Sequence, residues 1–129
     1  MKKQIVFLLL ILVVFSCRQK VYIQESSNEA SEMAIAMRNM VANLKEAKIA
    51  LEQGRDYQLS IDNFKNHDFT DDSFHREYFN PMADAFLLSV KKFDETPSIE
   101  HYEIVVNSCK SCHISMCPGP LELIETLSY

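Results

Sequence analysis

The chain has 129 residues, with 13 basic and 18 acidic side chains and a formal net charge of −5. Removal of the N-terminal segment described below takes away two lysines and no acids, so the mature chain carries 11 basic and 18 acidic residues and a charge of −7. Such a chain lacks the basic face that binds nucleic-acid phosphates, and a positively charged protein partner suits it better. The mature length is enough for one domain with a small core.

The N-terminus has the three parts of a bacterial export signal. Two lysines precede eleven uninterrupted apolar residues, 5–15, and a serine and a cysteine follow. As a helix the apolar run would rise only about 16 Å, roughly half of a hydrocarbon core. The pattern therefore predicts a cleaved signal peptide over residues 1–16, with an uncleaved membrane anchor as the alternative.

The sequence Val14-Phe15-Ser16-Cys17 resembles the lipobox of bacterial lipoproteins, in which a peptidase cuts before a cysteine that becomes lipid-modified. The resemblance implies that Cys17 is the lipidated first residue of the mature chain and anchors it to a membrane. Ordinary secretory cleavage nearby is the alternative. Arg18 is not the aspartate that commonly retains lipoproteins at the inner membrane, so we expect a periplasm-facing lipoprotein of the cell envelope, with the outer membrane favoured.

A long helix is predicted to follow a short tether. Residues 17–27 show no sustained period, so the folded domain is expected over residues 28–129. Ser26 with Glu29 predicts a capping box at the start of the helix, and Gly54 predicts its end. Seven apolar residues at alternating spacings of three and four predict one buried stripe: Ala30, Met33, Met37, Met40, Leu44, Ala47 and Leu51.

Residues 55–71 are less regular. Leu59, Ile61 and Phe64 are expected to form a short helix, although the many Asp and Asn residues around them favour turns.

Further helices are predicted in the second half of the chain. Helical spacing over residues 72–93 is interrupted by Pro81, which predicts a kink or a restart near Asn80. Ser98 is the predicted N-cap of a later helix that ends at Cys117. The residues expected along one side of that helix are Ile99, Tyr102, Val105 or Val106, Cys109 and Cys112. A short amphipathic tail is predicted from Leu121, Leu123, Ile124 and Leu127. With no alternating strand pattern, the predicted fold is all-α, an antiparallel bundle.

Cys109-Lys110-Ser111-Cys112-His113 is the attachment pattern of a c-type haem. Two thiols three residues apart on a helix can reach both vinyl groups of one porphyrin, and the histidine that follows can bind the iron. A zinc site would need further Cys or His clusters, and a thiol-redox site expects a βαβ context; the sequence shows neither. We therefore predict one covalent haem c on Cys109 and Cys112, with His113 as an axial iron ligand.

An apolar first helix and a Cys-Lys-Ser-Cys-His motif on the last long helix resemble the cytochrome c-prime family. The resemblance covers roughly residues 28–117, and its discriminating part is the late position of the motif, because ordinary small cytochromes c carry it near their start. It implies an antiparallel four-helix bundle, here with a shortened second helix. It also implies a homodimer as one option. The Cys-Pro-Gly-Pro sequence 117–120 departs from the general family pattern.

Members of that family differ in the second axial position of the iron. Some leave it open or cover it with an apolar side chain and bind small gases, whereas others place a first-helix methionine on the iron and carry electrons. Alignment with the first-helix pattern makes Met37 the leading sixth ligand, Met40 the second and Met33 the third. Methionines at helical spacing are otherwise core residues. The alternatives for bis-histidine ligation are His67, His75 and His101.

The expected function is electron transfer by a membrane-anchored monohaem c-type cytochrome with His/Met ligation. No enzyme activity is expected, because the sequence has no paired carboxylates, nucleophile triad or phosphate-binding loop. The alternatives are a five-coordinate protein that binds gases such as NO or CO, and a zinc-stabilised structural lipoprotein. The expected partners are the membrane and redox proteins with a basic docking face. Cys117 has no assigned role and is either a small buried residue or a reactive thiol.

Overall fold

The computed structural model describes residues 30–129. Within them the chain forms no strand and contains α2 (Glu32–Glu52), the 3-10 turn η1 (Asp72–Phe74), α3 (Phe79–Glu95), α4 (Ile99–Met116) and α5 (Leu121–Glu125). The all-α class is therefore confirmed. Outside the described residues lie the predicted signal peptide (1–16), the lipidation site Cys17, the tether (17–27) and the capping-box residues Ser26 and Glu29.

Helix α2 starts slightly later than predicted. Ser31 is its N-cap, and the Ser31 hydroxyl accepts a hydrogen bond of 3.1 Å from the Ala34 N–H. The first helical residue is therefore Glu32, and Ala30 precedes the helix. At the other end Gly54 adopts a φ of +64°, the left-handed conformation common just after helices, so the predicted stop is confirmed.

The apolar stripe of α2 faces the core. Its buried residues are Met33, Met40, Leu44, Ala47 and Ala50. Met37 and Leu51 are half-buried and pack against the same core. The prediction of a single buried stripe therefore holds within the helix, with Ala50 added to it.

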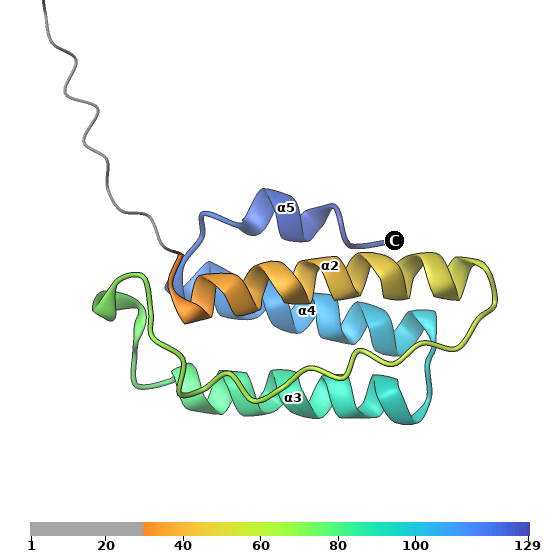
Figure 1. The fold of residues 1–129 in the computed structure, drawn as a ribbon, viewed down its shortest axis with the longest axis horizontal. Helices are drawn as coiled ribbons and strands as arrows, with labels where there is room; N and C mark the ends of the chain where they lie inside the picture. The colour runs from red at the N-terminus through yellow and green to blue at the C-terminus, as the bar shows by residue number, and fades with distance from the viewer. Residues whose placement is uncertain (1–29) are drawn as a thin grey trace, which may run out of the picture.

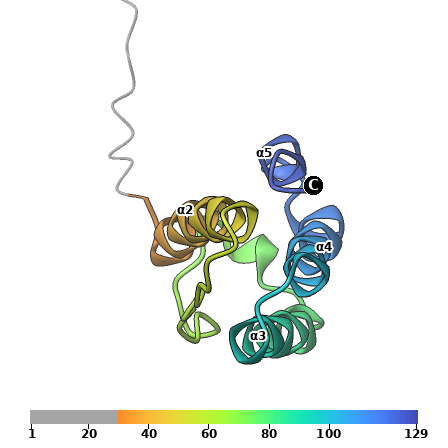
Figure 2. The same cartoon turned by 90° about the vertical axis from the view of Figure 1, so that its right-hand side faces the viewer.

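The expected short second helix is absent. Residues 55–71, here called the crossing segment, contain no helix, and their one backbone turn is closed by the His67 N–H donating to the Phe64 carbonyl at 3.1 Å. The segment leaves the end of α2 and runs back along the length of the molecule, antiparallel to both α2 and α3 (Figure 1). The end-on view places it next to these two helices (Figure 2). Non-helical chain therefore connects the end of α2 to the region before α3 along the length of the molecule.

Side chains of the flanking helices hold the backbone of the crossing segment. Asp94 on α3 accepts the N–H groups of Leu59 at 2.6 Å and Ser60 at 3.2 Å. Asn43 on α2 donates its amide to the Leu59 carbonyl at 3.0 Å and accepts the Tyr57 hydroxyl at 2.7 Å. Ser60 has a φ of 45°, and this left-handed conformation accompanies the binding of two successive N–H groups by one carboxylate. These contacts satisfy backbone groups that a helix would have satisfied internally.

The crossing segment also contributes two buried side chains to the hydrophobic core. Leu59 is 1% exposed and Phe64 is 5% exposed. The Phe64 ring meets the rings of Phe79 and Phe86 on α3 edge-on, with centroid distances of 6.2 and 5.8 Å. Burial of two such side chains stabilises the fold by about 1.5–3 kcal/mol each.

Helix α3 begins at Phe79, so the helical spacing over 72–93 places the start about two turns too early. Pro81 is the third residue of the helix. The N–H groups of the first turn have no partner within a helix, so the N–H that proline lacks costs no hydrogen bond there. The predicted restart near Asn80 is confirmed. Before it, Asp71 caps η1 by accepting the Ser73 N–H at 2.8 Å.

Helices α3 and α4 form an antiparallel hairpin and pack closely along their length (Figures 1 and 2). Ser98 caps α4 as predicted, because its hydroxyl accepts the His101 N–H at 3.1 Å. Tyr102 is fully buried and its ring packs edge-on against Phe93 with centroids 6.3 Å apart. Ile99, expected on the same side of α4, is 51% exposed; in the first turn the helix has not yet entered the core.

The C-terminal residues follow the prediction of a short amphipathic tail. Helix α5 packs on α4 (Figure 2), and Leu127 just after it is 1% exposed. The Tyr102 hydroxyl donates to the Leu127 carbonyl at 2.9 Å, and the Tyr129 hydroxyl donates to the Lys48 carbonyl at 3.2 Å. The tail thus ties the end of the chain to both α4 and α2.

Candidate functional site

The Cys-x-x-Cys-His motif lies near the C-terminal end of α4. Cys109 and Cys112 are one turn apart and share a face of the helix, and both pack against the hydrophobic core. Between them Ser111 is exposed, and its hydroxyl donates to the Asn107 carbonyl at 2.9 Å. The two thiols are therefore presented together on the inner side of the helix, as attachment to one porphyrin requires.

Both thiols lie in an apolar environment. Burial raises the pKa of Cys109 to about 12, with a smaller contribution from the neighbouring Cys112. Burial likewise raises the pKa of Cys112 to about 11, with a smaller contribution from Cys117. Reactive redox cysteines have lowered pKa values in electropositive surroundings, so this environment argues against thiol-disulfide chemistry here.

His113 has one ring nitrogen engaged by the chain and the other available. The side chain is 8% exposed. Its Nδ1 lies 3.0 Å from the Cys117 carbonyl oxygen, which can only accept, so Nδ1 carries the hydrogen. In that tautomer Nε2 presents a lone pair, which is what an axial iron ligand provides. The motif predicts a histidine that can bind a metal through one nitrogen, and the Nε2 of His113 has the form that this prediction requires.

Cys117, to which the sequence assigned no role, contacts His113. It is the C-cap of α4, its N–H donates to the His113 carbonyl at 3.1 Å, and its Sγ lies 3.3 Å from the His113 Nδ1. The thiol is half-buried, and burial raises its pKa. The sequence does contain a signal for this contact. Cys117 follows His113 by four residues, one helical turn, and directly precedes Pro118, which favours the end of the helix there.

The methionines of α2 are buried to different degrees. Met33 is 7% exposed and Met40 is 8% exposed, whereas Met37 is half-buried against the core. The N-terminal half of α2, which carries all three, runs alongside the C-terminal half of α4, which carries the motif (Figure 1). Met33 and Met40 are thus more deeply buried than Met37, and the choice of sixth ligand among the three stays a prediction.

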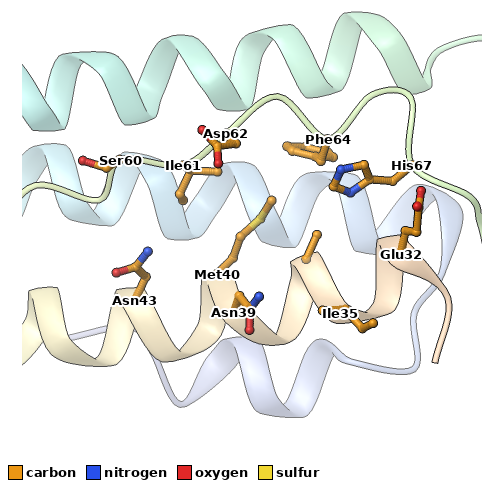
Figure 3. Close-up of a pocket in the computed structure, with 11 residues that line it drawn as sticks. Glu32, Ile35, Asn39, Met40, Asn43, Ser60, Ile61, Asp62, Phe64 and His67 are labelled. Atoms are coloured by element: carbon orange, nitrogen blue, oxygen red, sulfur yellow. The ribbon is translucent and has the colours of Figure 1, made fainter. Parts of the chain in front are cut away.

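A groove of about 360 Å³ runs between α2 and the crossing segment, and Met40 lines it. Figure 3 shows the Met40 side chain reaching from α2 toward the stretch that carries Ile61 and Phe64. His67 lies at the same groove, and its Nδ1 is buried without a hydrogen-bond partner among the described residues.

The other two histidines considered as iron ligands are placed differently. His75 is exposed and stacks on Phe69 with ring centroids 5.3 Å apart. His101 is half-buried, and its Nδ1 is hydrogen-bonded to the Thr96 carbonyl at 2.7 Å near the opposite end of α4 from the motif. In the sequence, both residues are separated from the Cys-x-x-Cys-His motif by more than one helical turn. Neither lines the groove beside Met40.

No three or more His, Cys, Asp or Glu side chains within residues 30–129 are arranged to hold a metal ion. The predicted haem does not need such a cluster, because the porphyrin supplies four nitrogen ligands and the chain only one or two more.

In the same residues no helix has the length and apolar character to cross a bilayer.

Comparisons with protein-family models, with curated proteins and with solved structures found no match for this chain.

Proposed function

We propose that the protein is a monohaem c-type cytochrome of the bacterial cell envelope that transfers electrons. The observation that carries the proposal is the end of α4: two thiols on one inner face, followed by a buried imidazole whose Nδ1 is bonded to the chain. In this proposal Cys109 and Cys112 hold the haem through thioether bonds, and His113 Nε2 is an axial ligand.

When bound, the haem supplies reversible one-electron oxidation and reduction of its iron. The chain contributes the rest. The core around α2, α3 and α4 excludes water, and this low polarity is one of the means by which a protein sets a reduction potential. A methionine of α2, Met37 or Met40, would be the sixth iron ligand in this proposal, and such a ligand would favour the reduced state.

The proposed resemblance to cytochrome c-prime concerns the order of elements along the bundle. The described residues contain three long helices, with the crossing segment in the place of the second. We propose that the domain is a four-membered bundle of that kind with one member extended. A homodimer through the first two members and an acidic surface for basic redox partners belong to the same proposal.

The N-terminal features give the location. Anchoring through lipid on Cys17 would hold the domain at a membrane on the periplasmic side, with the outer membrane favoured. That compartment is where c-type haem is attached, so the two parts of the proposal support each other.

A second candidate function is the binding of small gases at a five-coordinate iron. The observations that favour it are the incomplete burial of Met37 and the groove beside Met40, which opens between α2 and the crossing segment. Reduced and oxidised visible spectra separate the two functions. A low-spin spectrum without carbon monoxide binding supports electron transfer, and a high-spin spectrum with ready binding supports the gas function.

The deciding experiment is the intact mass of the full chain purified from cells able to attach c-type haem. We expect the mass of the lipidated chain plus one tetrapyrrole, and a pyridine haemochrome spectrum typical of two thioether bonds. The variants Cys109→Ala and Cys112→Ala are each expected to lose one bond. Cys117→Ala is the matched control, because it removes a thiol from the end of the same helix and should leave attachment intact. A mass without the tetrapyrrole would refute the proposal.

A further inference from the structure

We propose that Cys117 is a positioning residue for His113, and that the Cys117-Pro118 step fixes the imidazole in the Nδ1–H tautomer with Nε2 free for a metal. The consequence for a haem rests on the proposed function. The structural part concerns the chain alone and can be tested without the cofactor.

Three contacts join the two residues. The Cys117 N–H donates to the His113 carbonyl at 3.1 Å, the His113 Nδ1–H donates to the Cys117 carbonyl at 3.0 Å, and the Cys117 Sγ lies 3.3 Å from the same Nδ1. The imidazole is therefore held between a strong acceptor and a weak one on a single residue. Because the side chain is 8% exposed, water has little access to compete for that hydrogen.

The proline that follows explains why the carbonyl is available. A residue before proline is disfavoured in the helical region by a clash with the proline ring, and Cys117 has an extended conformation with φ −151° and ψ 82°. In a continuing helix its carbonyl would point along the axis toward the N–H four residues later. The break at Pro118 instead turns the carbonyl back toward the ring one turn earlier, where it meets Nδ1.

The arrangement has a redox consequence once the iron is bound. A hydrogen bond from Nδ1–H to a carbonyl raises the basicity of the imidazole and fixes the orientation of its ring. Stronger donation from Nε2 stabilises the oxidised iron and lowers the reduction potential. Cys117 and Pro118 would therefore set part of the potential through the imidazole of His113.

The test compares Pro118→Ala with the matched control Pro120→Ala, which removes a proline from the same turn but leaves the residue after Cys117 unchanged. The first readout is nitrogen NMR of His113 in the full chain, prepared without haem in detergent at about pH 9, where histidines are ordinarily neutral. We expect the Nδ1–H form to predominate in the wild type and in Pro120→Ala. In Pro118→Ala we expect the preference to fall roughly fivefold, the factor that one net hydrogen bond supplies.

Cys117→Ala separates the carbonyl from the thiol, because it keeps the backbone acceptor and removes the sulfur. It is expected to retain the tautomer and thus shows that the carbonyl does most of the positioning. Circular dichroism checks that each variant is folded. An Nε2–H tautomer in the wild type overturns the inference whether or not Pro118→Ala folds, and so does an unchanged tautomer in a folded Pro118→Ala.

The second readout is the reduction potential of the haem-loaded chain. Pro118→Ala is expected to have a higher potential than the wild type, while Pro120→Ala keeps the wild-type value; equal potentials for all three overturn the redox part. If the chain carries no haem, the proposed function fails, and the tautomer measurement still decides the structural part.

Discussion

Replacement of Asp94 by alanine tests whether a single carboxylate on α3 holds the crossing segment in place. The carboxylate accepts two backbone N–H groups, at 2.6 Å from Leu59 and at 3.2 Å from Ser60. A hydrogen bond to a charged group contributes about 1.5–3 kcal/mol, and the longer bond contributes less. Leu59 is 1% exposed, so after the substitution water cannot readily replace the carboxylate at its N–H. We therefore expect a loss of about 2–4 kcal/mol in the free energy of unfolding.

Urea unfolding followed by circular dichroism measures this loss. For a domain of about 100 residues, the same change lowers the melting temperature on the order of 10–20 °C. Asp84→Ala is the matched control, because Asp84 lies on the same helix but pairs with Lys65 at the surface with a side chain 61% exposed. That substitution is expected to change the stability by about 0.5 kcal/mol or less. If Asp94→Ala unfolds at the same urea concentration as Asp84→Ala, the carboxylate does not anchor the segment.

Four further predictions concern the metal ligand, the thiols and the anchor. Met37→Ala should turn the iron high-spin while the haem stays attached, as visible spectra would show; an unchanged spectrum would instead favour Met40, whose own alanine variant should then give the high-spin form. In the haem-free chain Cys109 and Cys112, with pKa values raised to about 12 and about 11, should react slowly with an alkylating reagent at about pH 8; reaction at the rate of a free cysteine would contradict the burial of both thiols. Because the folded-state pKa values lie above the ordinary value of 9.0, the stability that these thiols contribute is present below about pH 9 and is lost as the pH rises toward 11, which urea midpoints across that range would reveal. Cys17→Ala should abolish labelling with radioactive fatty acid, and label that persists on the variant would remove the lipoprotein assignment.

Some helix boundaries set by local chemistry were predictable from the sequence, although the cap of α2 was predicted at Ser26 and is Ser31. Ser98 caps α4 through a hydroxyl that reaches a backbone N–H three residues later, and Gly54 follows α2 because it adopts a left-handed φ without strain. Pro81 likewise indicated the restart of α3. In each case the interacting groups lie within a few residues, so the pattern alone carries the information.

The crossing segment could not be predicted in the same way. The apolar residues Leu59, Ile61 and Phe64 are too few to distinguish a short helix from an extended chain with two buried anchors. The groups that decide between them are distant: Asn43 lies 16 residues from Leu59, and Asp94 lies 35 residues from it. Tertiary hydrogen bonds therefore override the local preference.

The candidate site was predictable in composition and only partly in geometry. The spacing of Cys109, Cys112 and His113 identified the residues, but it could not show that Nδ1 of the imidazole is occupied by Cys117. The ranking of Met37 over Met40 came from a family pattern. The burial of each methionine depends on how α2 is rotated against the rest of the core, which periodicity alone fixes only to within about one residue.

In an otherwise helical domain, the crossing segment has backbone hydrogen bonds that exist only while it contacts α2 and α3. A helix carries its own backbone hydrogen bonds with it when it separates, whereas the stretch around Leu59 gives up its bonds to Asp94 and Asn43 as it leaves. The hairpin of α3 and α4 keeps its internal bonding through such an event. Amide protons of residues 57–64 should therefore exchange with solvent well before those of α4, and the interior should become accessible from this side while the turns that bear the two thiols stay folded.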